Sequence, residues 1–114
     1  MIAMNTVWTD ALARAEAFAP FLAGAMGRWP GLVDVLAQGE GEAALGMARA
    51  AGAGLPVDIA LRKERDALAL VLAIGDLAGA FPLARVTQEL SALADRALDA
   101  AIRGAIAERV EGAD

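Results

Sequence analysis

The sequence predicts an all-α protein: a compact bundle of about five to six helices with two long C-terminal helices. Apolar residues recur at the i, i+3, i+4, i+7 spacing of a helix along the whole chain. No segment shows the apolar and polar alternation of β-branched residues that marks a strand. Prolines and glycines interrupt the helical pattern at several points, so the helices are separate elements.

A chain of 114 residues fits one domain and can bury about 60 to 70% of the surface that its unfolded form exposes. We therefore predict a single helical domain over residues 1–114. Its strongest breaker is Gly52-Ala53-Gly54-Leu55-Pro56, a Gly/Pro loop that joins the subclusters 1–52 and 57–112. This run is either a hinge between the subclusters or a plain surface loop.

The first helix is expected to be capped by Thr6 or Thr9, with Trp8, Leu12 and Ala15 on one apolar stripe. A second helix should start at Pro20, which suits a first helical turn. Its expected inward residues are Phe21, Leu22, Ala25 and Met26.

From Pro30 the pattern predicts one or two helical turns that end at Gly39, followed by an Ala-rich helix over 40–51. Large side chains are scarce in this chain, since only 4% of its residues are aromatic. The expected large core anchors are therefore Trp8, Phe18, Phe21, Trp29 and Phe81.

The next helix should be capped by Asp58 and should run to about Gly75. Its segment 67–74 is apolar on every face, so it needs neighbouring helices on every side. The last helix should run from about Pro82 to Val110 with two adjacent apolar stripes, which make a wide face rather than a coiled-coil seam. The stripes are Val86, Leu90, Leu93, Ala97, Ala101 and Ala105, and Ala94, Leu98, Ile102 and Ile106.

The net charge of −5 disfavours the phosphate-binding surface that nucleic-acid recognition requires. Every uncharged apolar run, such as the one between Asp66 and Asp76, is far too short to span a bilayer, so no membrane association is expected. The absence of cysteine and of a basic signal-peptide region fits a cytoplasmic location.

Chemistry-bearing side chains are rare: the chain has no His, Cys or Tyr. Ser91 is the only serine and has no nearby base, which makes it an unlikely nucleophile. Asp95 and Asp99 lie one turn apart and could ligate a divalent cation, but a solvated face with Asp99 paired to Arg103 is the favoured interpretation. We predict no catalytic, cofactor-binding or metal-binding residue in this chain.

The chain has one cluster of basic residues, which consists of Arg62, Lys63 and Arg65. These side chains either form a solvated helix face, balanced by neighbouring carboxylates including Asp58 and Asp66 at i, i+4 spacing, or place an arginine on a carboxylate of an adjacent helix. Asp76 and Asp95 are the two candidate carboxylates for such a bidentate contact.

Several short motifs lie between Leu61 and Asp95: Leu61-Arg62 with Arg65, the apolar run to Ile74, Asp76-Leu77 with Gly79, and Thr87, Leu90-Ser91 and Leu93-Ala94-Asp95. In these motifs the sequence resembles the glutamine synthetase adenylyltransferase/deadenylyltransferase family, in the helical region before its first nucleotidyltransferase domain. Weaker support comes from Phe18-Ala19-Pro20-Phe21-Leu22, which is similar to an early Ser-Pro-Phe-Leu turn of the family with Ala19 in place of Ser.

The resemblance implies a parent enzyme that regulates nitrogen assimilation, uses ATP and Mg²⁺, and adds AMP to or removes it from glutamine synthetase. Its nucleotidyltransferase domains hold metal through an Asp-x-Asp motif, which these 114 residues lack. No catalytic residue is therefore carried over. The resemblance thus implies that the chain is a truncated, non-catalytic piece of that enzyme, which is inactive alone and has no cofactor of its own.

The expected partners are the following nucleotidyltransferase domain and, further, glutamine synthetase or a nitrogen-signalling protein. The isolated chain is expected either to self-associate as a homo-oligomer or to bind the following domain. The alternative is a free-standing helical interaction or oligomerisation module unrelated to nucleotidyl transfer. In either case the candidate structural or interface residues are Arg62, Arg65, Asp76, Thr87, Ser91 and Asp95.

Overall fold

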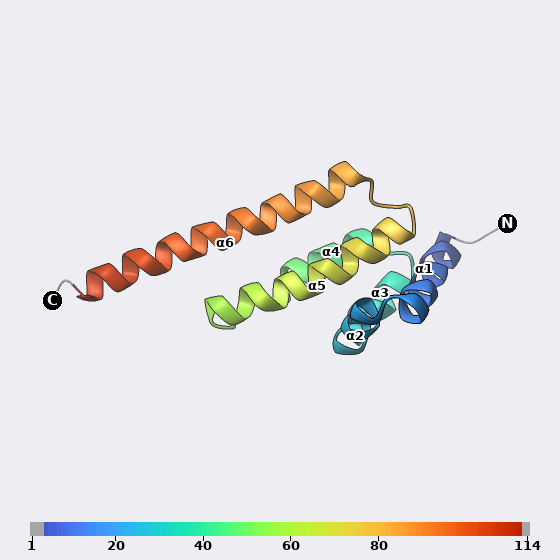
Figure 1. Ribbon diagram of the computed structural model, residues 1–114, viewed down its shortest axis with the longest axis horizontal. Coiled ribbons are helices and arrows are strands. Elements are labelled where there is room, and N and C mark those ends of the chain that lie inside the picture. Colours follow the sequence, from blue (N-terminus) through green and yellow to red (C-terminus); the bar gives the residue numbers. More distant parts are fainter. Residues whose placement is uncertain (1–3, 113–114) are drawn as a thin grey trace.

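The computed structural model describes residues 4–112 and shows six helices and no strand over that range (Figure 1). The all-α prediction is confirmed, as are the number of helices and the two long helices at the C-terminal end. The first three and the last two residues of the predicted domain lie outside the described range. The helices are α1 (Met4–Phe18), α2 (Pro20–Arg28), α3 (Pro30–Ala37), α4 (Gly41–Arg49), α5 (Val57–Leu77) and α6 (Leu83–Gly112).

Prolines and glycines set most helix ends, as expected. Pro20 and Pro30 occupy the first turns of α2 and α3, where the missing proline N–H costs no hydrogen bond. Gly39 and Gly79 follow α3 and α5 with φ of 80° and 73°, a backbone conformation that suits glycine.

The capping predictions were wrong at two helices. Helix α1 already includes Met4, so Thr6 and Thr9 lie inside it, where the Thr9 hydroxyl donates to the Thr6 carbonyl oxygen at 3.0 Å. Helix α5 is preceded by Pro56, and Asp58 therefore lies in the first turn instead of at the cap. At this position its charge still faces the positive end of the helix dipole.

Helix α5 is the centre of the core. It contacts each of the other five helices, and its apolar segment is buried apart from the half-buried Ala69 and Ala73. The expectation that this segment needs neighbours on every side is confirmed. The largest fully buried side chains are Leu36, Leu45, Leu68, Leu70, Val71 and Ile74.

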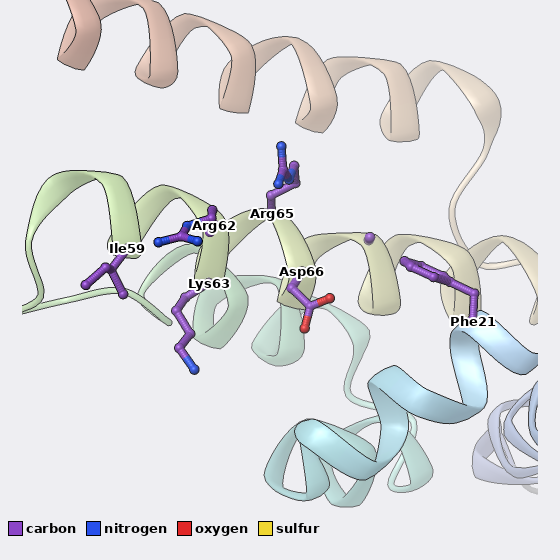
Figure 2. A pocket seen from close by; sticks show the side chains of 7 residues that line it. Phe21, Ile59, Arg62, Lys63, Arg65 and Asp66 are labelled. Carbon is purple, nitrogen blue, oxygen red and sulfur yellow. The ribbon is translucent and has the colours of Figure 1, made fainter.

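Two of the five expected aromatic anchors are not in the core. Phe18 and Phe21 are 83% and 66% exposed. They flank the α1–α2 junction, where Phe18 is the last residue of its helix and Phe21 extends from α2 toward the exposed side of α5 (Figure 2). Trp8 and Phe81 are buried and meet edge to face, with ring centroids 5.9 Å apart.

The Gly/Pro loop before α5 is closely packed at one point. Gly52 is buried, and a Cβ atom there would collide with the backbone of Ala60. Side chains from both predicted subclusters belong to one hydrophobic cluster, including Leu45 before the loop and Leu68 after it. A single core therefore spans the loop.

Helix α6 runs antiparallel to α5 and continues beyond the start of that helix (Figure 1). Its N-terminal half lies on the body formed by α1–α5, whereas all residues from 101 to 110 are exposed. The molecule is therefore elongated, with principal dimensions of 67, 27 and 22 Å.

Candidate interaction surface

Two ion pairs with buried carboxylates hold the N-terminal half of α6 on the body. Arg96 of α6 pairs with Glu64 of α5, and Arg49 of α4 pairs with Glu89 of α6. Both glutamates are only 7% exposed. A buried carboxylate without a cation is strongly unfavourable, so these pairs define the register of α6 on the body.

A third ion pair lies at the other end of the contact between α6 and the body. The Arg85 guanidinium donates two hydrogen bonds, of 2.8 and 2.7 Å, to the carboxylate oxygens of Glu42 in α4. These bonds lower the pKa of Glu42 and raise that of Arg85. Arg85 also lies over the Phe81 ring, 5.7 Å from its centroid.

Asp66 joins α2 to α5. It accepts two hydrogen bonds from Arg28, of 2.9 and 2.8 Å, and a third of 2.7 Å from the Trp29 indole N–H. The Arg28 hydrogen bond lowers the pKa of Asp66 most, partial burial opposes it, and the Trp29 bond adds to the lowering. The Lys63 ammonium lies 5.8 Å from the Trp29 ring centroid.

The candidate residues from the sequence are all exposed in the structure: Arg62, Arg65, Asp76, Thr87, Ser91 and Asp95. Within the described residues, the ion pairs that form do not include Arg62 or Arg65. Bidentate contacts between helices are made instead by Arg28 with Asp66 and by Arg85 with Glu42. The first of these also explains why Asp66 does not pair with Arg62. The expected Asp99–Arg103 pair is present, at 3.0 Å.

Three of these candidates open onto a groove along α5. One face of this helix stays uncovered between α2 and α6 and carries, in order, Arg62, Arg65, Ala69, Ala73 and Asp76. Their spacing of three or four residues makes a continuous stripe. We call the depression over this stripe the α5 groove.

The α5 groove consists of two hollows that meet at Ala69. The first has a volume of about 780 Å³. Its lining is Phe21, Ile59, Arg62, Lys63, Arg65, Asp66 and Ala69. The second has a volume of about 310 Å³. Its lining is Ala69, Leu72, Ala73, Asp76, Leu83, Val86 and Leu90.

The groove is basic at one end and acidic at the other. Figure 2 shows Arg62 and Lys63 on the N-terminal part of α5, Arg65 turned toward α6, and Phe21 reaching from α2 toward α5. At the opposite end Asp76 lies among the apolar side chains Leu83, Val86 and Leu90 of α6. The arrangement can bind a rod-shaped apolar partner with opposite charges at its two ends.

A second uncovered apolar surface lies on the distal half of α6. Leu98, Ile102, Ile106 and Val110 are 61%, 51%, 58% and 67% exposed. They follow one another every four residues and form one row, which we call the α6 row. Only part of the apolar face expected from the sequence is therefore buried, chiefly at Leu93.

Among residues 4–112, no three acidic side chains come close enough together to hold a metal ion. No helix in that range is both long enough and apolar enough to cross a membrane. The α5 groove and the α6 row are exposed surfaces that suit an intermolecular role.

Sequence reasoning missed several residues that shape these surfaces. Arg28 and Asp66 are 38 residues apart, and no local pattern links them. Phe21 was expected in the core and instead forms a groove wall. Leu83 carried a weak signal, since it directly follows Pro82, the expected start of the last helix, and is itself the first residue of α6.

Comparisons of the chain with protein-family models, curated proteins and solved structures find no match.

Proposed function

We propose that this chain is a non-catalytic docking scaffold, the N-terminal helical region of a glutamine synthetase adenylyltransferase/adenylyl-removing enzyme. The resemblance of the Arg62 to Asp95 region to that family supports the assignment. The α6 row is the single structural observation that carries the scaffold role. Four large apolar side chains in one exposed line are an incomplete interface.

Covering the row would be favourable. Burying the exposed part of each large side chain contributes on the order of 1 kcal/mol. The flanking charges of Asp99 and Arg103 already pair with each other at the surface and need not be buried. A partner could therefore cover the part of the row beside Asp99 and Arg103 without desolvating an unpaired charge there.

In this proposal the partner is the nucleotidyltransferase domain that follows the helical region in the resembling enzymes. Joining the two segments in one polypeptide would raise their effective concentration, so a modest interface would suffice. ATP and Mg²⁺ would bind the partner domain, and contacts with glutamine synthetase or a nitrogen-signalling protein would be made by the assembled enzyme in its cytoplasmic setting.

The test is binding to that domain, supplied as a separate polypeptide from the downstream part of the gene. We expect a complex in isothermal titration calorimetry that Ile102→Lys with Ile106→Lys weakens at least about tenfold, because two ammonium groups would enter the apolar contact. Ala13→Lys with Ala17→Lys places the same charges at the same spacing on the exposed face of α1 and should leave affinity unchanged.

A stop codon directly after residue 114, with no such domain encoded beyond it, would contradict the assignment to this enzyme. Equal binding by both double variants would contradict the role of the α6 row. AMP transfer by the purified chain alone would overturn the non-catalytic assignment.

A free-standing oligomerisation module is the second candidate, and the symmetry of the α6 row favours it. Leu98 and Ile106 lie four residues on either side of Ile102, so two antiparallel copies could match apolar side chains around a two-fold axis at that residue. Light scattering over a concentration series tests this: a rise in mass that Ile102→Lys abolishes supports it. A strict monomer with no dye-accessible apolar patch contradicts it.

A further inference from the structure

The α5 groove is separate from the α6 row and has its own chemistry. Its floor is the stripe from Arg62 to Asp76, 15 residues of helix, whose first and last Cα atoms are about 21 Å apart along the helix axis. Ala69 and Ala73 in the middle of the stripe are short enough for another backbone to approach closely. Phe21 on one side and Leu83 and Leu90 on the other give it apolar walls.

The walls are exposed to solvent although they are apolar. Phe21, Leu83 and Leu90 are 66%, 80% and 48% exposed. Three large apolar side chains along one depression are more than isolated surface residues, and they indicate a binding surface.

The charges at the two ends of the groove determine which kind of segment can bind there. Asp66 is neutralised by Arg28, so Arg62, Lys63 and Arg65 leave the first end positive in a chain whose net charge is −5. Asp76 makes the other end negative. A bound segment should therefore be acidic at one end, apolar in the middle and basic at the other end.

We propose that the α5 groove binds an amphipathic helix of a partner protein, about four turns long. Acidic side chains of that helix lie over Arg62 and Arg65, and a lysine or arginine lies over Asp76. Its small and apolar residues at i, i+3, i+4 and i+7 spacing pack on Ala69 and Ala73 between the walls. This is the helix-in-groove mode of recognition, with the charges at the two ends specifying the partner.

The probe for this proposal is a fluorescein-labelled helical peptide with glutamates in its first turn, a Leu/Ala face and lysines in its last turn. Fluorescence anisotropy against the full chain should show saturable binding that weakens with added salt. Arg62→Glu with Arg65→Glu should weaken it about tenfold, since two attractions become repulsions. Arg103→Glu with Arg109→Glu changes the net charge equally, outside the groove, and should leave affinity unchanged.

A charge exchange makes the test specific. A second peptide with lysines at both ends should bind the Arg62→Glu, Arg65→Glu variant more tightly than the unaltered chain. Ala73→Trp should block either peptide, with Ala17→Trp on the exposed face of α1 as the matched control. Because a tryptophan at half-buried Ala73 can disturb α5, Leu90→Gln on the groove wall provides an independent test, and circular dichroism checks the fold of each variant.

The proposal is overturned if neither peptide binds saturably at concentrations up to about 1 mM. It is equally overturned if the groove variants bind like the controls, or if Ile102→Lys with Ile106→Lys removes binding, which would place the peptide on the α6 row. A doubling of mass that Ala73→Trp abolishes would show a second copy of this chain in the groove instead of a partner helix. Loss of binding to the downstream domain leaves this proposal standing, because that experiment concerns the α6 row.

Discussion

Two glycines allow the Trp8 and Phe81 rings to meet. A Cβ at position 41 would lie 2.6 Å from Cη2 of Trp8, and a Cβ at position 75 would overlap the Phe81 ring. Gly41 is the first residue of α4 and Gly75 lies inside α5, and alanine is normally preferred over glycine inside a helix. The absence of a side chain at these positions is therefore a packing requirement.

Gly75→Ala should destabilise the protein by about 1 to 3 kcal/mol, because Phe81 must move out of a close-packed site. Gly46→Ala is the matched control: it lies within α4, and an added Cβ would meet no neighbouring atom within 4 Å. There we expect a gain of about 0.5 to 1 kcal/mol. Urea unfolding measures both, and equal effects would refute the role of the Phe81 contact.

A second prediction for a single residue is that Asp66 contributes to the loss of stability of the fold in acid. Its pKa is lower in the folded chain than in the unfolded one, since only the folded chain places Arg28 and Trp29 on it. Its contribution to stability is therefore complete above the unfolded pKa of about 4 and is lost as the pH falls through the folded value.

Asp66→Asn should lower the melting temperature by a few degrees at neutral pH and flatten the decline below about pH 4. Thermal melts over a pH series measure this. Asp99→Asn removes an exposed carboxylate in an i, i+4 pair and serves as the control. An unchanged acid profile in Asp66→Asn would show that other groups cause the decline.

At the level of elements, α6 has two halves with different environments. The proximal half places Leu93, Glu89 and Arg96 on the body, whereas residues 101–110 of the distal half are all exposed. A helix without tertiary contacts is only marginally stable in water, so the distal half depends on its continuity with the docked half.

Arg96→Ala should cost about 1 to 3 kcal/mol, because it leaves the buried Glu64 carboxylate without its cation. Hydrogen exchange of the backbone amides over residues 83–97 should accelerate. Arg103→Ala, at the surface of the distal half, should cost less than about 0.5 kcal/mol. Equal protection of α6 in both variants would show that the ion pair does not hold this helix.

On the scale of the whole molecule, α6 makes the chain extended. The radius of gyration is 16.5 Å, whereas a compact domain of this length has about 13 Å. The difference arises from the end of α6 that projects past α5 (Figure 1).

Removal of residues 101–114 should shorten the molecule without unfolding it. The free energy of unfolding should change by less than about 1 kcal/mol, since residues 101–110 are fully on the surface. Small-angle scattering should give a radius of gyration near that of a compact domain. A cut before Leu93 is the contrasting variant, because it also removes a core residue and the Arg96–Glu64 pair and should unfold the chain.

Much of the fold could be predicted because helix formation and helix ends depend on nearby residues. The spacing of Trp8, Leu12 and Ala15 correctly identified a buried face, and the apolar run before Gly75 correctly identified the central helix. The sequence also named Arg62, Arg65 and Asp76 as candidate interface residues, but the stripe that they share on α5 emerged only from the structure. Local periodicity could not predict which residues of other helices would face them across the groove.

The contacts between distant elements were decided by the tertiary arrangement. Asp66 could pair with Arg62 one turn away or with Arg28 far along the chain, and the approach of α2 to α5 selected Arg28. Phe21 is a large apolar residue of the kind found in cores, yet most of its side chain stays exposed. Likewise, the apolar face of α6 continues along the whole helix, but α5 is shorter than α6 and covers only the first half of that face. Local sequence determines which faces are apolar, while helix lengths and packing determine which of those faces stay open to a partner.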